Sequence, residues 1–104
     1  MAVKQIKTFD EFKNIINKGV TFVDFFTTWC GPCKMLSPIV DEVSEEVTNM
    51  KFIKVDIDQM HDAAEVYGVQ SIPTIIIFKD GKPINSFLGY RPKSEVLKFI
   101  NEKK

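Results

Sequence analysis

The residues that stand out as able to do chemistry are Cys30 and Cys33, the only two cysteines in the chain of 104 residues. They lie in the stretch "FFTTWCGPCKM", with Gly31 and Pro32 between them. A C-x-x-C pair can bind a metal ion, close a structural disulfide, or open and close as a redox-active disulfide. Chance spacing of two inert cysteines is a fourth alternative.

The metal and structural alternatives are weakened by what surrounds the pair. A structural zinc site normally takes four ligands, and a single C-x-x-C supplies half of them. His61 is the only histidine, so we expect no metal site within one chain, although sharing of zinc between two chains stays open. A disulfide that encloses so short a segment would remove little loop entropy from the unfolded chain. The pattern therefore favours a redox role.

A redox role also fits the position of the pair between a buried strand and a helix. Residues three apart on a helix face the same side with Cβ atoms roughly 5–6 Å apart, which suits a disulfide. We expect Cys30 at the helix N-terminus, where free N–H groups and the helix dipole lower the pKa of a thiol. Cys33, one turn further in, is expected to be more buried, and Pro32 suits the first helical turn. The two thiols are therefore predicted to be unequal, one attacking and one resolving.

Asp24 interrupts the apolar strand that precedes the cysteines. By strict alternation it shares a face with Val20, Phe22 and Phe26, so we expect its side chain to be buried. A buried carboxyl group without a partner has a raised pKa. The alternative is an acid that points to solvent at the end of a strand. The pattern favours the buried acid and makes Asp24 a candidate site residue.

Short apolar runs alternate with helical patterns along the chain. Strands are predicted at 3–6, 20–26, 51–57, 74–78 and 83–89, with Asp80-Gly81 at the turn of a final hairpin. Helices are predicted from a Thr8–Glu11 capping box to Gly19, from Pro32 to Val47, from an Asp58 cap to Tyr67, and from Pro92 onward. Their expected inward positions are Phe9, Phe12, Ile15 and Ile16, then Met35, Leu36, Ile39, Val40 and Val43, and finally Val96, Leu97 and Ile100. This order predicts an α/β fold, with a central mixed sheet of about five strands and about four helices on both faces.

The length, charge and apolar content of the chain limit the classes of function that it can have. A chain of this length fits a single domain over residues 1–104. Lys+Arg and Asp+Glu both number 14, and no basic stripe is present, which argues against a general binder of nucleic acid or of anionic membranes. The N-terminus shows no signal-peptide pattern, and the longest apolar run, "IIIF", is too short to span a bilayer. We therefore expect a cytoplasmic protein, in which a purely structural disulfide would be unusual.

Four stretches together, "VDFFTTWCGPCKMLSP", "SIPT", "FKDGK" and "FLGYRPKS", resemble the thioredoxin family. The resemblance covers essentially the whole chain, and "WCGPC" is specific because glutaredoxins and protein disulfide isomerases usually carry other residues between the cysteines. It implies the thioredoxin fold and a protein-disulfide reductase. It also implies that Asp24 accepts and donates a proton for Cys33 and that Lys54 lies near Asp24. From the pattern alone, Lys54 is as readily a solvated strand lysine.

The resemblance further implies a surface that binds substrates around the sulfur atoms. "SIPT" resembles the cis-proline loop of the family, whereas the statistics of X–Pro bonds alone favour a trans bond before Pro73. The backbone of Ile72 is expected to pair with an extended substrate segment. The polar Thr27 and Thr28 favour an exposed Trp29, the alternative being a core aromatic residue. The expected surface consists of Trp29, Gly31, Pro32, Ile72, Pro73 and Gly89.

The activity that the resemblance implies is dithiol–disulfide exchange. Cys30 attacks a substrate disulfide, and Cys33 resolves the mixed disulfide with the help of Asp24, which leaves the Cys30–Cys33 disulfide. The expected partners are disulfide-containing proteins and a flavin-dependent thioredoxin reductase that supplies electrons from NADPH. The chain has no G-x-G-x-x-G, so it is expected to bind no cofactor itself and to act as a monomer. An oxidant of the same fold and a non-catalytic binding or assembly subunit stay open.

Two positions depart from the family pattern. Phe26 stands where many members carry a second tryptophan, and Ser71 where a glycine is common. Phenylalanine keeps an aromatic filler but lacks the indole N–H donor, which puts one hydrogen bond near the active-site loop in doubt. His61 is expected at the surface.

Overall fold

A mixed sheet with strand order β1-β3-β2-β4-β5 runs through the computed structural model, which describes residues 3–102. The strands are β1 (Val3–Ile6), β2 (Val20–Phe26), β3 (Lys51–Asp56), β4 (Thr74–Lys79) and β5 (Lys82–Leu88). β1, β3 and β2 run parallel, whereas β4 is antiparallel to β2 and β5 is antiparallel to β4. The sheet that the sequence predicts is therefore confirmed, with the antiparallel hairpin at one edge.

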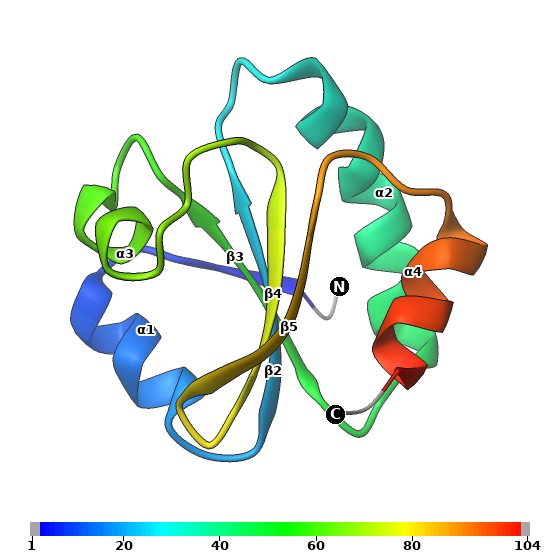
Figure 1. Ribbon diagram of the computed structural model, residues 1–104, viewed down its shortest axis with the longest axis horizontal. Coiled ribbons are helices and arrows are strands. Elements are labelled where there is room, and N and C mark those ends of the chain that lie inside the picture. The colour runs from blue at the N-terminus through cyan, green and yellow to red at the C-terminus, as the bar shows by residue number, and fades with distance from the viewer. Residues whose placement is uncertain (1–2, 103–104) are drawn as a thin grey trace.

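Helices cover both faces of this sheet (Figure 1). α1 (Phe9–Ile16) and α3 (His61–Val66) lie on one face, and α2 (Gly31–Glu46) and α4 (Lys93–Asn101) lie on the other. Within the described part of the chain, none of these helices is long and apolar enough to cross a membrane. The start of α2 lies at the end of the sheet where the parallel strands finish, which is the end that holds the two cysteines.

Each face of the sheet has its own core, and β2 contributes to both. Val23 and Phe25 pack toward α1 and α3, whereas Phe22 packs toward α2 and α4. Because successive side chains of a strand point to opposite faces, the same alternation places Asp24 on the α2 side. β2 lies between β3 and β4, which explains why its sequence is apolar on both faces.

The Thr8 cap and the predicted hairpin are present, but the Glu11 side chain pairs with Lys4, so only half of the predicted capping box is confirmed. The Thr8 hydroxyl accepts a hydrogen bond from the Glu11 N–H at 3.1 Å. Asp80 and Gly81 both have positive φ, 49° and 88°, as the tight turn of a two-residue hairpin requires. The Asp80 carboxylate also accepts from the Gly19 N–H at 2.8 Å, which joins the hairpin turn to the segment before β2.

Several helix predictions are wrong in detail. α3 begins at His61 with Met60 before it and no side-chain cap, so Asp58 does not cap it. Met35 is 59% exposed, because the sheet-facing stripe of α2 runs through other positions. In α4, Leu97 and Ile100 are only half-buried, while Phe99, which was not predicted to face inward, is buried. That stripe of α2 is Cys33, Leu36, Val40 and Val43.

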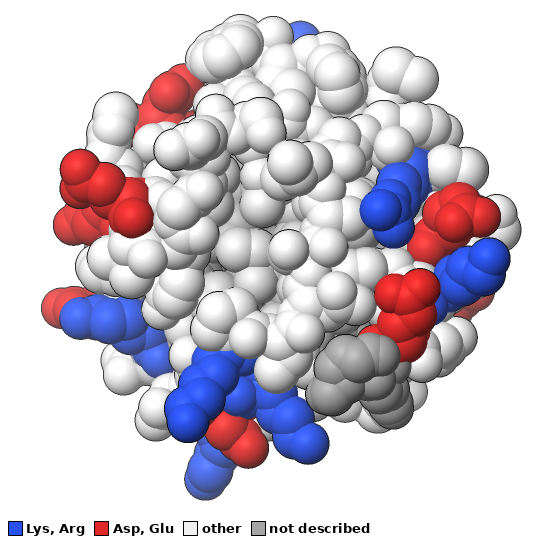
Figure 2. All heavy atoms as spheres, viewed as in Figure 1, with Lys and Arg blue, Asp and Glu red and all other residues white. Residues whose placement is uncertain are grey.

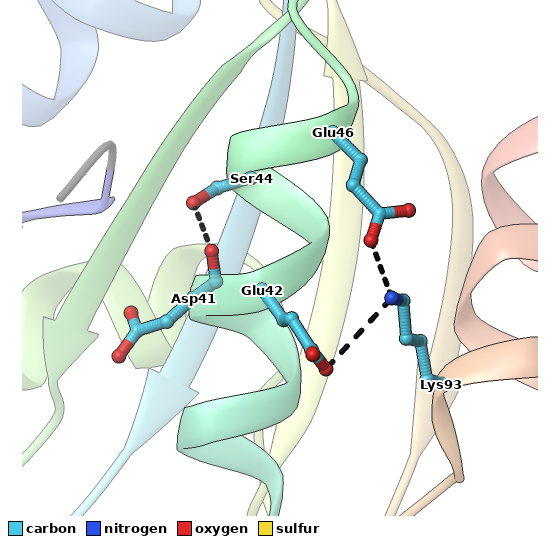
Figure 3. Close-up of polar contacts among 5 residues, drawn as sticks. All are labelled: Asp41, Glu42, Ser44, Glu46 and Lys93. Atoms are coloured by element: carbon cyan, nitrogen blue, oxygen red, sulfur yellow. Dashed lines mark hydrogen bonds and ion pairs between the residues drawn. The ribbon is translucent and has the colours of Figure 1, made fainter.

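An ionic contact joins the two helices of the α2 side (Figure 3). Lys93, the first residue of α4, bonds to the carboxylate of Glu46, and its Nζ lies 3.9 Å from Glu42 Oε1. Within α2, the Ser44 hydroxyl donates to the carbonyl of Asp41 at 2.7 Å. The Lys93 contact lies at the surface, so it orients α4 against α2 more than it stabilises the fold.

Candidate active site

The two cysteines are joined in a disulfide at the start of α2, with their Cα atoms 5.3 Å apart. Cys30 is the cap residue of α2, and its Sγ accepts a hydrogen bond from the Cys33 N–H at 3.1 Å. Pro32 lies in the first turn, as predicted. Cys30 Sγ therefore occupies the place where the N–H groups of a helix start favour negative charge on sulfur.

Burial does not distinguish the two cysteines. Cys30 is 5% exposed and Cys33 is 4% exposed, so the prediction that Cys33 is the more buried residue is wrong for this disulfide form. The bond holds both side chains against the same helical turn, which explains their equal burial. The two cysteines differ in their surroundings. Cys30 Sγ accepts a hydrogen bond from an N–H at the start of α2, whereas Cys33 lines a cavity.

That cavity, of about 220 Å³, connects Cys33 with Asp24. Asp24 is buried at 4% exposure, as the strand alternation predicts, and its Oδ1 has no hydrogen-bond partner among the described residues. A space of this size can hold water, which occupies roughly 30 Å³ per molecule in the liquid. The buried acid and one cysteine thus share a polar chamber. Its lining residues are Asp24, Phe26, Thr27, Thr28, Cys33, Lys34, Ser37 and Lys54.

The electrostatics of this chamber favour a proton exchange near neutral pH. Burial raises the pKa of Asp24 to about 7, and the positive charge of Lys54 opposes part of that rise. The negative charge of Asp41 on α2 adds to it. An acid with a pKa near 7 can both accept and release a proton under ordinary conditions. Asp24 is therefore suited to general acid–base chemistry.

Lys54 lies where the resemblance places it. It is the register partner of Asp24 between β2 and β3, and its Nζ stands 5.6 Å from the centre of the Phe26 ring. The aromatic ring that replaces the common tryptophan therefore contacts the lysine instead of offering an N–H donor. No ion pair joins Lys54 to Asp24 in the described part of the chain, so Lys54 acts on the carboxyl group through its charge.

Trp29 is exposed, as predicted, at 69%. Its indole Nε1 donates to Asp58 Oδ2 at 2.9 Å, which holds the ring beside the cysteines. The sequence prediction missed this contact, although β2 and β3 run parallel and their carboxyl ends therefore meet. Of the two polar neighbours that favoured an exposed Trp29, Thr28 is exposed but Thr27 is buried at 1%. Thr27 instead lines the cavity.

The peptide bond between Ile72 and Pro73 is cis, as the resemblance implies and as X–Pro statistics alone do not. Pro73 is buried, and its carbonyl accepts a hydrogen bond from the Gly89 N–H at 2.8 Å. This bond joins the proline loop to the segment after β5. Ile72 is half-buried, Ser71 is exposed, and the backbone N–H and C=O of Ile72 have no partner in the described loop and turn contacts.

Charge is distributed unevenly over the face drawn in Figure 2. Lysines gather near the β4–β5 turn, whereas the end that carries the start of α2 shows few charged side chains. His61 is exposed, as predicted. Within residues 3–102, no three His, Cys, Asp or Glu side chains are grouped so as to hold a metal ion.

Known proteins resemble this chain over nearly its full length. The family model described as thioredoxin matches residues 3–102. The chain is 43% identical over 93 residues to a thioredoxin of Chlamydia caviae, covering 89% of this chain and 91% of the relative. It is 41% identical over 101 residues to a thioredoxin of Listeria monocytogenes, covering 96% and 97%. A solved thioredoxin structure from Plasmodium falciparum matches with a TM-score of 0.91 at 35% identity, covering 97% of this chain and 99% of that one.

Proposed function

The chain belongs to the thioredoxin family and is a thiol–disulfide oxidoreductase, and we propose that it reduces protein disulfides with Cys30 as the nucleophile and Cys33 as the resolving thiol. The observation that carries these roles is the unequal setting of the pair. Cys30 Sγ meets the start of α2, and Cys33 shares a cavity with the buried Asp24.

The first step is attack by the Cys30 thiolate on one sulfur of the substrate disulfide. A bond forms between Cys30 Sγ and that sulfur, the substrate S–S bond breaks, and the second substrate sulfur leaves as a thiolate that takes a proton from solvent. The N–H groups at the start of α2 stabilise the attacking thiolate. Gly31 and Pro32 keep this turn short and place Cys30 at its edge.

The second step is attack by Cys33 on Cys30 Sγ, which breaks the mixed disulfide. Cys33 must first lose its proton, and Asp24 is suited to take it, because the two line one cavity and the pKa of Asp24 is raised to about 7 by burial. Lys54 keeps that pKa from rising further through its charge. The products are the Cys30–Cys33 disulfide and the reduced substrate, so two electrons pass to the substrate.

Substrates bind on the weakly charged surface around the sulfur atoms. Trp29 offers an exposed ring held by Asp58, and the free backbone of Ile72 before the cis bond suits pairing with an extended segment. Pro73 and Gly89, joined by a hydrogen bond, hold the proline loop against the segment after β5 and so support this surface. Such a surface depends on backbone pairing and apolar contact, so it accepts many disulfide-bearing segments.

We propose the remaining assignments, for which family membership is the support. The redox-active group is the Cys30–Cys33 disulfide itself, and electrons reach it from NADPH through a thioredoxin reductase. The other partners are disulfide-containing proteins. The chain acts as one domain over residues 1–104, as a monomer, in the cytoplasm.

A trapping experiment tests the two cysteine roles. Cys33→Ser leaves Cys30 free to attack but removes resolution, so a purified variant should accumulate mixed disulfides with protein substrates that dithiothreitol releases. Cys30→Ser is the matched control and should trap none. If Cys33→Ser forms no mixed disulfide, or if Cys30→Ser traps as much, the assignment of nucleophile and resolving thiol is wrong.

A further inference from the structure

Three buried side-chain oxygens in the described residues have no hydrogen-bond partner: Thr21 Oγ1, Asp24 Oδ1 and Thr27 Oγ1. Buried polar groups in folded proteins are almost always bonded to protein or to ordered water, so each of these needs an explanation. Asp24 and Thr27 both line the cavity that reaches Cys33, whereas Thr21 does not. The cavity therefore joins two of the three unpaired groups to one of the reacting sulfurs.

Thr27 does not lie on the face of the sheet that strand alternation predicts for it. β2 ends at Phe26, and Thr27 is the next residue, buried at 1% where the chain turns toward the cysteines. An alternating strand would put Thr27 on the same face as Thr21, opposite Asp24. Because the strand has ended, Thr27 lines the Asp24 side instead. Thr28 and Ser37 also line this chamber, but of the three lining hydroxyl groups only that of Thr27 is buried without a hydrogen-bond partner among the described residues.

We propose that Thr27 is a positioning residue for the resolution step, and that its hydroxyl holds the water through which Asp24 takes the proton of Cys33. The proposal rests on the proposed function of Cys33 and Asp24. A buried water typically has about three hydrogen-bond partners, and the carboxyl, the thiol and the hydroxyl together supply that number. A cavity of 220 Å³ has room for it.

The proton and electron balance of the step is simple. The Cys33 S–H gives its proton to the water, and the water gives a proton to the Asp24 carboxylate. The Cys33 thiolate then bonds to Cys30 Sγ, and the sulfur of the substrate leaves with the electron pair of the broken bond. Thr27 only accepts or donates a hydrogen bond, so it gains and loses no proton.

Other groups near Asp24 carry charge but cannot replace this role. Lys54 on β3 and Lys34 on α2 line the cavity with positively charged ends, and Asp41 on α2 acts on Asp24 through its charge. A lysine ammonium group donates hydrogen bonds but accepts none. A hydroxyl group does both, so Thr27 can orient a water toward a carboxylate and toward a thiol.

A substrate with two chromophoric halves separates the two chemical steps. With a symmetric aromatic disulfide whose thiols absorb when released, attack by Cys30 releases the first thiol and resolution by Cys33 releases the second. Thr27→Val removes the hydroxyl and keeps the shape. We expect it to leave the first release unchanged and to slow the second about threefold to tenfold, the range for loss of one hydrogen bond.

The pH dependence of the second thiol release tests the role of Thr27 further, because a purely structural role would leave its midpoint unchanged. In Thr27→Val its midpoint should rise by up to about one pH unit, because the carboxylate loses a water-mediated hydrogen bond. Thr27→Ser, which keeps the hydroxyl, should restore both the rate and the midpoint. Thr21→Val is the matched control, since it removes an equally buried, unpaired hydroxyl outside the cavity and should behave as the unchanged chain.

The outcomes separate this inference from the proposed function. If Thr27→Val releases the second thiol at the original rate and midpoint while Asp24→Asn slows it, the role of Thr27 is wrong and that of Asp24 stands. If Thr21→Val slows the step as much as Thr27→Val, or Thr27→Ser does not restore it, the role of Thr27 is also wrong. If Asp24→Asn has no effect on the second release, the proton transfer in the proposed function fails.

Discussion

The two faces of β2 differ in what they bury. On the α1 and α3 side, Phe25 meets Phe12, which also stacks edge-on against Phe78 at 5.8 Å between ring centres. On the α2 side, the same strand buries Asp24 beside a polar cavity. Both faces carry an aromatic core, since Phe22 of β2 packs against Phe52 and Phe99 on the α2 side, but only the α2 side also keeps an unpaired acid.

This difference shows how a small domain can tolerate a buried group that lowers its stability. An unpaired buried carboxylate destabilises the fold, and the free energy for keeping it must come from contacts elsewhere. The aromatic cluster on the opposite face of the same strand is one source of that free energy, because close-packed rings add to burial. The acid–base group of β2 therefore lies on one face only, and Phe12→Ala and Asp24→Asn should have effects of opposite sign on the stability of the fold.

The largest effect is expected from Phe12→Ala in the aromatic cluster. Removing a fully buried ring leaves a cavity and should lower the free energy of unfolding by about 3–5 kcal/mol. Both thiol-release rates of the folded protein should stay the same, because Phe12 lies in the core on the face of the sheet opposite α2 and its cysteines. Urea unfolding and the two-step release assay measure the two quantities. A change in the second release larger than the change in the first would contradict the separation of the faces.

Asp24→Asn should instead stabilise the fold and slow the second thiol release. Burial raises the pKa of Asp24 from 3.8 to about 7, so the folded chain binds a proton that the unfolded chain has lost between these values. The stability of the unchanged protein should therefore fall as pH rises from about 4 to about 7. The asparagine variant lacks this loss and should be more stable above neutral pH, by up to about 4 kcal/mol. If the free energies of unfolding of the two proteins differ by the same amount at every pH in this range, the burial argument is wrong.

Lys54→Met should have a smaller effect on the same face. Burial raises the pKa of Asp24 and the Lys54 charge opposes it, so removal of the charge should move the pKa further up. Carbon-13 NMR of the Asp24 carboxyl group follows this directly, and a rise of up to about one pH unit is expected for a charge lost near a partly solvated site. Lys34→Met is a matched control on the α2 wall of the cavity. A fall in the pKa after Lys54→Met would rule out the proposed influence of Lys54.

The smallest effect is expected from Lys93→Met at the α2–α4 contact shown in Figure 3. The hydrogen bond to Glu46 raises the pKa of Lys93, but the pair lies at the surface, where solvent screens it. The thermal midpoint should fall only slightly, less so at high salt, and neither release step should change. Lys93→Arg, which keeps the charge, should restore the midpoint. A large loss of stability would show that α4 depends on this contact more than on its buried residues.

The sequence predicts the framework well because hydrophobic periodicity determines it. The strand alternation that buries Asp24 and the positive φ at Asp80 and Gly81 follow from local pattern, and both are confirmed. The cis bond before Pro73 is also confirmed, but only the resemblance predicted it, since local statistics favour trans.

The features that the sequence prediction missed depend on how separate segments meet in space. The burial of Thr27 was not predicted, because it depends on the strand ending one residue earlier and on the chain turning inward there. Asp58 was expected to cap α3, but the meeting of two parallel strand ends brings it to the Trp29 indole. Met35 fits a helical spacing yet lies outside the stripe that the sheet covers.

The central claim is that the acid on the polar face of β2 takes the proton of Cys33. Its most direct test is the pH dependence of the second thiol release in the unchanged chain and in Asp24→Asn. We expect a midpoint near the Asp24 pKa of about 7 in the unchanged chain, and a slower release without that midpoint in the variant. The same midpoint in both proteins would contradict it.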